Sequence, residues 1–219
     1  MIKKKHITLQ AVLLVILFLA ALFVFCYIAD ETIHEKEERF DININTYRVA
    51  HTGPAIVSVM KVLTWFGTMQ FLLTAYIIMI LVILLKKNYR FAIAIIIIAI
   101  GAWAVTIISK KLFHRSRPDL PLVTKLTNYS FPSGHAFSSF IFCCMLSYIV
   151  WHSRLQLLWK WMINVALLLF TLSIGLSRII LNVHYTTDVI GGFSLGIMWM
   201  ILMYIVFKNW LRTGKVLHT

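Results

Sequence analysis

Long apolar runs alternate with short polar segments along the whole chain. Six of these runs are long enough, or nearly so, to cross a bilayer core of roughly 30 Å at about 1.5 Å per helical residue. They cover about residues 7–29, 62–85, 91–109, 136–151, 161–180 and 189–207. The pattern predicts an all-α membrane protein with six transmembrane helices. Because no internal repeat or low-complexity segment is present, we expect a single membrane-embedded domain over residues 1–219.

The segment at residues 30–53, between the first two runs, has a different pattern. It contains six of the eight acidic residues of the chain, so it cannot lie in hydrocarbon. Ile33, Phe40, Ile44 and Tyr47 recur within it at roughly helical spacing. This spacing is typical of an amphipathic helix on the membrane surface, although a solvated connector is equally compatible. The acids would repel an anionic head group, so we expect the segment to lie to one side of any anion site.

Composition agrees with insertion in a membrane. Hydrophobic residues make up 60% of the 219 positions, far above the share usual in a soluble domain. The formal net charge of +13 raises the question of a nucleic-acid partner. The bases stand in short clusters between apolar runs, however, and membrane topology with anionic lipid explains such clusters better. We therefore expect no nucleic-acid partner, and the sequence leaves the oligomeric state open.

Neither the cysteines nor the histidines form a metal-binding pattern. The three cysteines lie inside apolar runs, and the eight histidines show neither His-x3-His nor His-x2-His pairing. The sequence therefore predicts no metal site and no cofactor.

Charge clusters beside the runs indicate the orientation in the cell membrane. If the N-terminal lysines are inside, the inner face carries eleven bases and no acid, and the outer face carries ten bases and all eight acids. The count of bases barely favours this orientation. We adopt it because five of the outer bases lie within residues 110–125, where a binding role explains them. Both termini are then cytoplasmic, and the loops after the third and fifth runs lie together at the extracellular face.

Three polar blocks adjoin the outer ends of these runs. They read, in chain order, Lys110-x6-Arg117-Pro118, then Pro132-Ser133-Gly134-His135, then Ser177-Arg178-x5-His184-x3-Asp188. Ionisable groups beside hydrocarbon are costly and therefore indicate function. In the third block we infer a break near Asn182, after which a new helix begins near Thr186 or Thr187, either of which can cap it. A tight loop whose charges face water is the alternative.

The residue types in these blocks suit the binding of an anion. Lys110, Arg117 and Arg178 supply three cations for a phosphate dianion, the arginines as bidentate forks and the lysine as a point charge. Ser133 is well placed to cap the fourth transmembrane helix. The N-terminus of that helix, beside Gly134, offers backbone N–H groups to an anion.

Two histidines are candidates for catalysis. His184 and Asp188 are four residues apart, so on a helix the carboxylate can orient the imidazole. His184 held in this way is a candidate nucleophile, and His135 is a candidate general acid for the departing oxygen. Spacing and chemistry alone thus indicate an anion site with two candidate histidines.

The three blocks together resemble, in order and without substitution, the signature of the type-2 phosphatidic acid phosphatase superfamily. The resemblance implies a phosphohistidine intermediate at His184, a relay through Asp188 and protonation of the leaving group by His135, with no metal. It also implies phosphate binding by Lys110, Arg117, Ser133, Gly134 and Arg178.

The length of the chain and its six-span layout are similar to those of the bacterial phosphatidylglycerophosphatase B group. This resemblance implies hydrolysis of phosphatidylglycerophosphate to phosphatidylglycerol, with undecaprenyl pyrophosphate, phosphatidic acid and diacylglycerol pyrophosphate as alternative substrates. Transfer of the phosphoryl group to a lipid or sugar hydroxyl is a second hypothesis. A transport or lipid-binding protein, which would use the basic cluster only as an anion site, is a third.

Three residues beside the first block have interpretations of their own. Lys111 adjoins Lys110, and only the spacing to Arg117 selects Lys110 as the lysine of the first block; the register with Lys111 is the alternative. His114 and Arg115 can contact a lipid head group, but a solvated loop edge is the interpretation that we favour.

Overall fold

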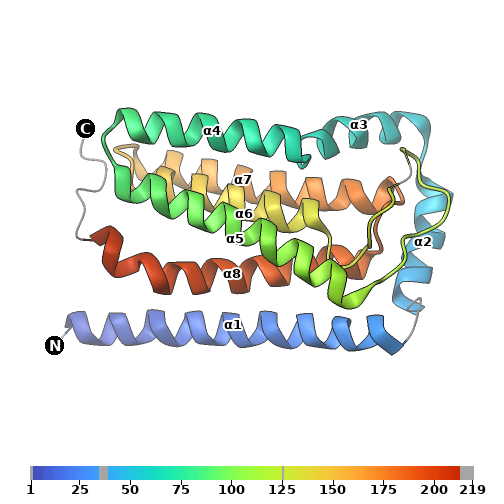
Figure 1. Cartoon of the computed structure of the whole chain (residues 1–219), viewed down its shortest axis with the longest axis horizontal. Coiled ribbons are helices and arrows are strands. Elements are labelled where there is room, and N and C mark those ends of the chain that lie inside the picture. The colour runs from blue at the N-terminus through green and yellow to red at the C-terminus, as the bar shows by residue number, and fades with distance from the viewer. Residues whose placement is uncertain (1, 35–38, 125, 213–219) are drawn as a thin grey trace.

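The computed structural model describes residues 2–34, 39–124 and 126–212, and within them the chain forms eight α-helices and no β-strand (Figure 1). The helices are α1 (Ile2–His34), α2 (Arg39–His51), α3 (Pro54–Trp65), α4 (Met69–Leu85), α5 (Tyr89–Phe113), α6 (Gly134–Trp151), α7 (Leu157–Ile180) and α8 (Thr186–Arg212). The predicted all-α class is therefore confirmed.

The long helices run roughly along one direction and form a bundle (Figure 1). Apolar side chains of α5, α6 and α8 form its core, in which Ile95, Phe137 and Ile141 are fully buried. The outward faces carry exposed leucine, isoleucine and valine, which is unusual in water but is what a helix needs against lipid. The start of α1 and the end of α8 share one end of the bundle, and the loop residues 114–124 and 126–133 lie at the other (Figure 1).

Five of the described helices are each long and apolar enough to cross a membrane. If α3 and α4, which are bent by 42° at their junction, are counted as one broken span, the described residues contain the six predicted apolar spans. The second span was expected to be one helix over residues 62–85, but it starts at Pro54 and is interrupted after Trp65. The other five expected spans are helices, each extending a few residues beyond at least one expected end.

Residues 66–68, which we call the elbow, separate α3 from α4 for reasons of packing and capping. A Cβ atom added at Gly67 would lie 2.7 Å from Cδ2 of His135 and 2.8 Å from Cγ2 of Ile174. The backbone therefore approaches α6 and α7 more closely than any side chain would allow. The hydroxyl of Thr68 accepts the N–H of Phe71 at 3.4 Å, so α4 begins with its own cap.

Helix α2 crosses the end of the bundle at a steep angle to the long helices (Figure 1). Residues 39–51 form a helix, as the surface-helix interpretation predicted, and the position of this helix on a membrane surface stays a prediction. Its apolar residues do not dock it, however, because Phe40 and Tyr47 are exposed whereas Asp41 is only 3% exposed. The expectation that the whole acidic segment lies to one side is therefore wrong, since Asp41 is buried among the polar blocks.

The turn between α7 and α8 has the predicted break. Helix α7 ends at Ile180, and Asn182 adopts a positive φ of 55° that a short polar side chain tolerates. The amide of Asn182 donates to the carbonyl oxygen of Asp119 at 2.6 Å, which ties the turn to the loop after α5. The expected threonine cap is wrong: the N–H of Thr187 is instead accepted by Oδ1 of Asp41 at 3.1 Å.

Candidate active site

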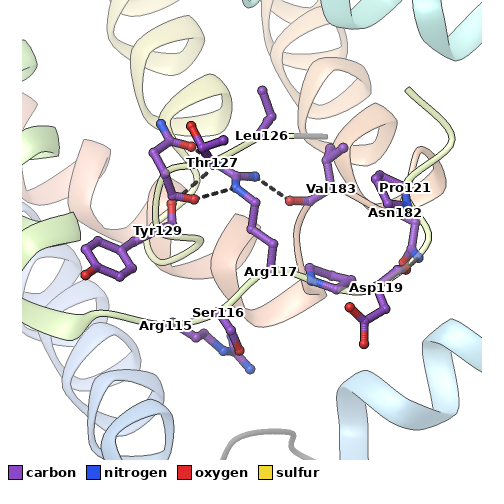
Figure 2. A pocket seen from close by; sticks show the side chains of 12 residues that line it. Arg115, Ser116, Arg117, Asp119, Pro121, Leu126, Thr127, Tyr129, Asn182 and Val183 are labelled. Atoms are coloured by element: carbon purple, nitrogen blue, oxygen red, sulfur yellow. Dashed lines mark hydrogen bonds between the residues drawn. The ribbon is translucent and has the colours of Figure 1, made fainter. Parts of the chain in front are cut away.

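The three polar blocks meet at one end of the bundle. Arg117, in the loop after α5, places Nη1 3.1 Å from Nε2 of His184, which lies 67 residues further along the chain. The same guanidinium donates to the carbonyl oxygen of Val183 (Figure 2). The predicted meeting of these two loops on one side of the protein is therefore confirmed, and the water-facing loop alternative is wrong.

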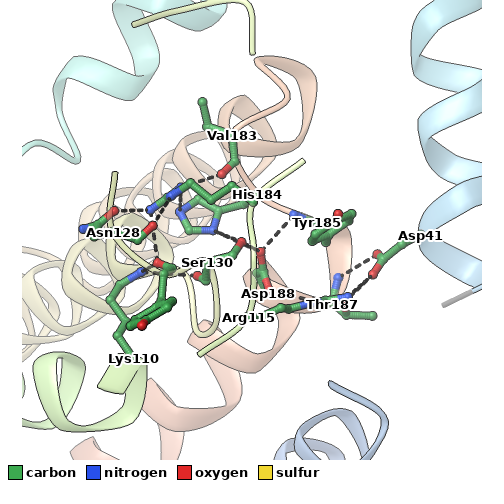
Figure 3. A network of polar contacts seen from close by, with 12 residues as sticks. Asp41, Lys110, Arg115, Asn128, Ser130, Val183, His184, Tyr185, Thr187 and Asp188 are labelled. Carbon is green, nitrogen blue, oxygen red and sulfur yellow. Dashed lines mark hydrogen bonds and ion pairs between the residues drawn. The ribbon is translucent and has the colours of Figure 1, made fainter. Parts of the chain in front are cut away.

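His184 and Asp188 are buried together, and their hydrogen bonds assign the form of the imidazole (Figure 3). Oδ2 of Asp188 lies 3.1 Å from Nδ1 of His184. A guanidinium has no acceptor, so Arg117 donates to Nε2, and Nδ1 must carry the proton. Burial, opposed by the hydrogen bond and charge of Asp188, lowers the pKa of His184 to about 3. The ring is thus neutral at neutral pH, with the Nε2 lone pair directed at the cationic side of the site.

Arg117 is fixed by the loop that it belongs to. Its Nε donates to the carbonyl oxygen of Asn128 at 2.8 Å, and its Nη2 donates to the side-chain oxygen of Asn128 at 2.7 Å. Burial lowers the pKa of Arg117, and the charge of Asp188 opposes this change. The guanidinium remains charged, because an arginine side chain cannot be deprotonated in a protein. Beside it lies a cavity of about 310 Å³ lined by Arg117, Asn128, Tyr129 and Val183, among other residues.

The other two cations of the motifs also point inward. Nζ of Lys110 donates to the carbonyl oxygens of Tyr129 and Ser130, whereas Lys111 is exposed, so Lys110 is the one of these two lysines that lies in the site. Arg178 is buried and donates from Nη1 to the hydroxyl of Thr64 in α3.

Three buried side-chain polar atoms in this part of the protein have no protein partner among the described residues. They are Nε of Arg115, Nε of Arg178 and Oγ of Ser133. Buried polar atoms are rarely left unpaired, and an anion with several oxygens would satisfy the donors of Arg178 and Ser133.

Ser133 and Gly134 begin α6, but their hydrogen bonds differ from the expectation. Ser133 occupies the N-cap position, yet its side chain caps no backbone N–H, so the expected side-chain cap is wrong. Its own N–H donates to the carbonyl oxygen of Asp188 at 2.9 Å and is not free for a ligand. Gly134 lies against Lys110, since a Cβ atom added at Gly134 would be 4.0 Å from Cε of Lys110. The N–H groups of the first turn still direct positive potential at the site.

His135 lies in the first turn of α6, where the elbow packs against its ring. No hydrogen bond from its ring to another described residue is found. Its nitrogens are therefore available to a leaving group in this end of the bundle.

Sequence reasoning missed two groups beside the relay. Arg115 is only 4% exposed and donates to Oδ1 of Asp188 at 2.8 Å, so the solvated-edge interpretation of this residue is wrong. Burial acts against its charge, but Asp188 and Asp41 outweigh this effect and raise the pKa of Arg115. Ser130 donates from Oγ to Oδ2 of Asp188. In the sequence, the only indication that Ser130 belongs to the site was its position two residues before Pro132, where the second block begins. For His114, which is exposed, the loop-edge interpretation holds.

No group of three or more histidine, cysteine, aspartate or glutamate side chains within the described ranges is arranged to hold a metal ion.

The family model described as the PAP2 superfamily matches residues 90–212, which is more than half of the chain and includes all three blocks. The chain belongs to the PAP2 superfamily. With its spans and its complete signature, this PAP2 protein is a membrane-embedded lipid phosphatase.

Known proteins resemble the chain over most of its length. Phosphatidylglycerophosphatase B of Bacillus subtilis (strain 168) is 27% identical over 185 residues, which cover 84% of this chain and 91% of that protein. The crystal structure of a transmembrane PAP2-type phosphatidylglycerolphosphate phosphatase from Bacillus subtilis has a TM-score of 0.76 and 25% identity, covering 90% of this chain and 96% of that one. LpxE of Aquifex aeolicus has a TM-score of 0.63 at 20% identity, covers 78% of this chain and 98% of its own, and shares the fold.

Proposed function

We propose that this PAP2 phosphatase hydrolyses phosphatidylglycerophosphate to phosphatidylglycerol through a phosphohistidine at His184. The observation that carries the mechanism is the neutral imidazole whose unprotonated Nε2 faces Arg117, with Nδ1 held by Asp188. The choice of substrate is supported by the similarity to phosphatidylglycerophosphatase B over 84% of the chain.

In the first step, Nε2 of His184 attacks phosphorus and the bond from phosphorus to the glycerol oxygen breaks. His135 donates a proton to that oxygen, which leaves as a hydroxyl group. Asp188 stabilises the imidazolium character that develops on His184. The phosphoryl oxygens are bound by Lys110, Arg117, Ser133, Gly134 and Arg178, which neutralise the charge of the dianion.

In the second step, water attacks the phosphohistidine and its proton passes to His135, which now acts as a base. The bond from Nε2 to phosphorus breaks, and inorganic phosphate leaves while His184 returns to its neutral form. Each proton given up by His135 in the first step is thus recovered in the second.

We also propose that the chain is one domain in the cell membrane, with both termini cytoplasmic and the site at the extracellular face. Three basic residues where α4 ends and α5 begins support this orientation, because they lie away from the site and near span ends: Lys86, Lys87 and Arg90. This orientation is tested with Lys111→Cys as the single cysteine of the chain, beside the site. A membrane-impermeant reagent should label that cysteine in intact cells.

Phosphate release from a panel of lipid phosphates, in detergent with a chelator present, tests the function. We expect kcat/KM to be highest for phosphatidylglycerophosphate, ahead of undecaprenyl pyrophosphate, phosphatidic acid and diacylglycerol pyrophosphate. A higher value for another lipid would overturn the substrate assignment. Added acceptor alcohol tests phosphotransfer, because a phosphorylated alcohol would then replace part of the released phosphate.

A further inference from the structure

One carboxylate of α2, that of Asp41, is buried against the first turn of α8. Oδ1 of Asp41 accepts the N–H of Thr187 at 3.1 Å, and its Oδ2 accepts the hydroxyl of Thr187 at 2.6 Å (Figure 3). Asp41 therefore supplies the acceptor that the N-terminus of α8 needs. The cap comes from a residue 146 positions earlier in the chain.

Arg115 connects this carboxylate to the relay. Its Nη2 lies 3.0 Å from Oδ2 of Asp41, and its Nη1 lies 2.8 Å from Oδ1 of Asp188. Nη1 also donates to the hydroxyl of Thr187 at 2.7 Å, and the guanidinium lies over the ring of Tyr185 at 4.2 Å. The side chains of all three charged residues are at most 2% exposed.

The two oxygens of Asp188 have separate partners. Oδ2 accepts from Ser130, from the N–H of Tyr185 at 2.9 Å and from Nδ1 of His184 at 3.1 Å. Oδ1 accepts from Arg115. The arginine therefore fixes the plane of the carboxylate from the side opposite to the imidazole.

We propose that Asp41 and Arg115 form a clamp that positions Asp188 toward His184, so that a helix lying across the end of the bundle completes the catalytic relay. This role rests on the assignment of Asp188 as the partner of His184 in the proposed mechanism. Both clamp residues are bonded to Asp188, to Thr187 or to each other, and neither is among the residues to which we assign phosphate binding, so both are positioning residues.

Loss of the clamp leaves Oδ1 of Asp188 buried without its charged donor, and the carboxylate can then rotate away from His184. A reacting group misplaced by about 1 Å costs roughly 100-fold in rate. The phosphate contacts of Arg117 and Lys110 do not pass through the clamp. Its loss should therefore lower kcat and leave KM almost unchanged.

The test compares steady-state kinetics of Arg115→Met, Arg115→Lys and Asp41→Asn with two controls that remove an exposed charge nearby, Lys111→Met and Asp119→Asn. We expect kcat to fall about 100-fold for Arg115→Met and about 10-fold for Asp41→Asn, with KM within about twofold. Arg115→Lys should restore part of the loss, because it keeps the charge but not the fork. Both controls should stay within about twofold of wild type.

A role in folding alone is separated from positioning by repeating Arg115→Met in an Asp188→Asn background, with single-turnover assays for the slow variants. If the clamp acts through Asp188, adding Arg115→Met to the Asp188→Asn protein lowers the rate of that protein by less than about threefold. A full 100-fold loss in that background, or a value of kcat for Arg115→Met and Asp41→Asn that matches the controls, would overturn the proposal. Any lipid phosphate that the wild type hydrolyses serves as substrate in this test. An error in the proposed substrate would show in the rates of the wild type, whereas an error in the proposed role of the clamp would show only in the rates of the variants.

Discussion

Replacing Gly67 by alanine perturbs the proposed general acid without touching the nucleophile or the cations. The new Cβ atom would lie 2.7 Å from Cδ2 of His135 and 2.8 Å from Cγ2 of Ile174. Ordinary contact begins at 3.4 Å, so the imidazole must retreat by at least about 0.7 Å. Such overpacking costs about 1–3 kcal/mol in stability, and a displacement of this size costs on the order of 10- to 100-fold in the step that the group assists.

The assay measures phosphate release from a lipid phosphate and from an aryl phosphate, whose leaving group needs little protonation. We expect Gly67→Ala to lower kcat 10- to 100-fold for the lipid and less than about threefold for the aryl ester, because only the lipid alkoxide depends on the acid. Gly53→Ala is the neutral control, since nothing lies within 4 Å of its added Cβ. Gly101→Ala is the control for overpacking, because its Cβ would lie 2.6 Å from Trp199 in another part of the bundle.

Equal losses for both esters in Gly67→Ala would refute the argument that the elbow acts through the leaving group. The argument would also fail if Gly101→Ala, at a similar loss of melting temperature, reduced kcat for the lipid as strongly. Retention of full activity in a folded Gly67→Ala protein would show that His135 can move without loss of function.

Three further predictions concern the nucleophile and the charge of the site. His184→Ala should abolish the acid-quenched phosphoenzyme formed from radiolabelled lipid phosphate and lower kcat at least about 10⁴-fold, and a persisting phosphoenzyme would contradict the covalent role. The pKa of His184 falls from 6.5 in the unfolded chain to about 3 in the folded protein. Below pH 6.5 the unfolded chain therefore binds more protons than the folded protein, and the free energy of unfolding decreases as the pH falls. Between pH 6.5 and 5 the free energy of unfolding of the wild type should therefore drop by up to about 2 kcal/mol more than that of His184→Gln, and parallel losses would be evidence against a neutral buried ring. A chelator should leave the rate of phosphate release unchanged, since Lys110, Arg117 and Arg178 supply the positive charge, and restoration of a lost rate by an added divalent cation would contradict this.

The apolar runs and the three blocks could be read from the sequence because each depends on neighbouring residues. A span needs only a continuous stretch of apolar side chains, so all six were found, and the break at Asn182 followed from the polar residues around it. The pair of His184 and Asp188 was found for the same reason, since one helical turn separates them.

The remaining parts of the site depend on contacts between distant segments, which no local pattern encodes. Asp41 meets Arg115 across 74 positions and Thr187 across 146, and an acid in a surface segment gives no local sign that it will be buried. The elbow was hidden in the same way, because Gly67 is required by a ring in α6 and not by its own neighbours. Local hydropathy and spacing thus determined the spans and the candidate catalytic residues. Only the packing of the helices decided which charges were buried together, because burial forces each charge to find a partner wherever the fold places one.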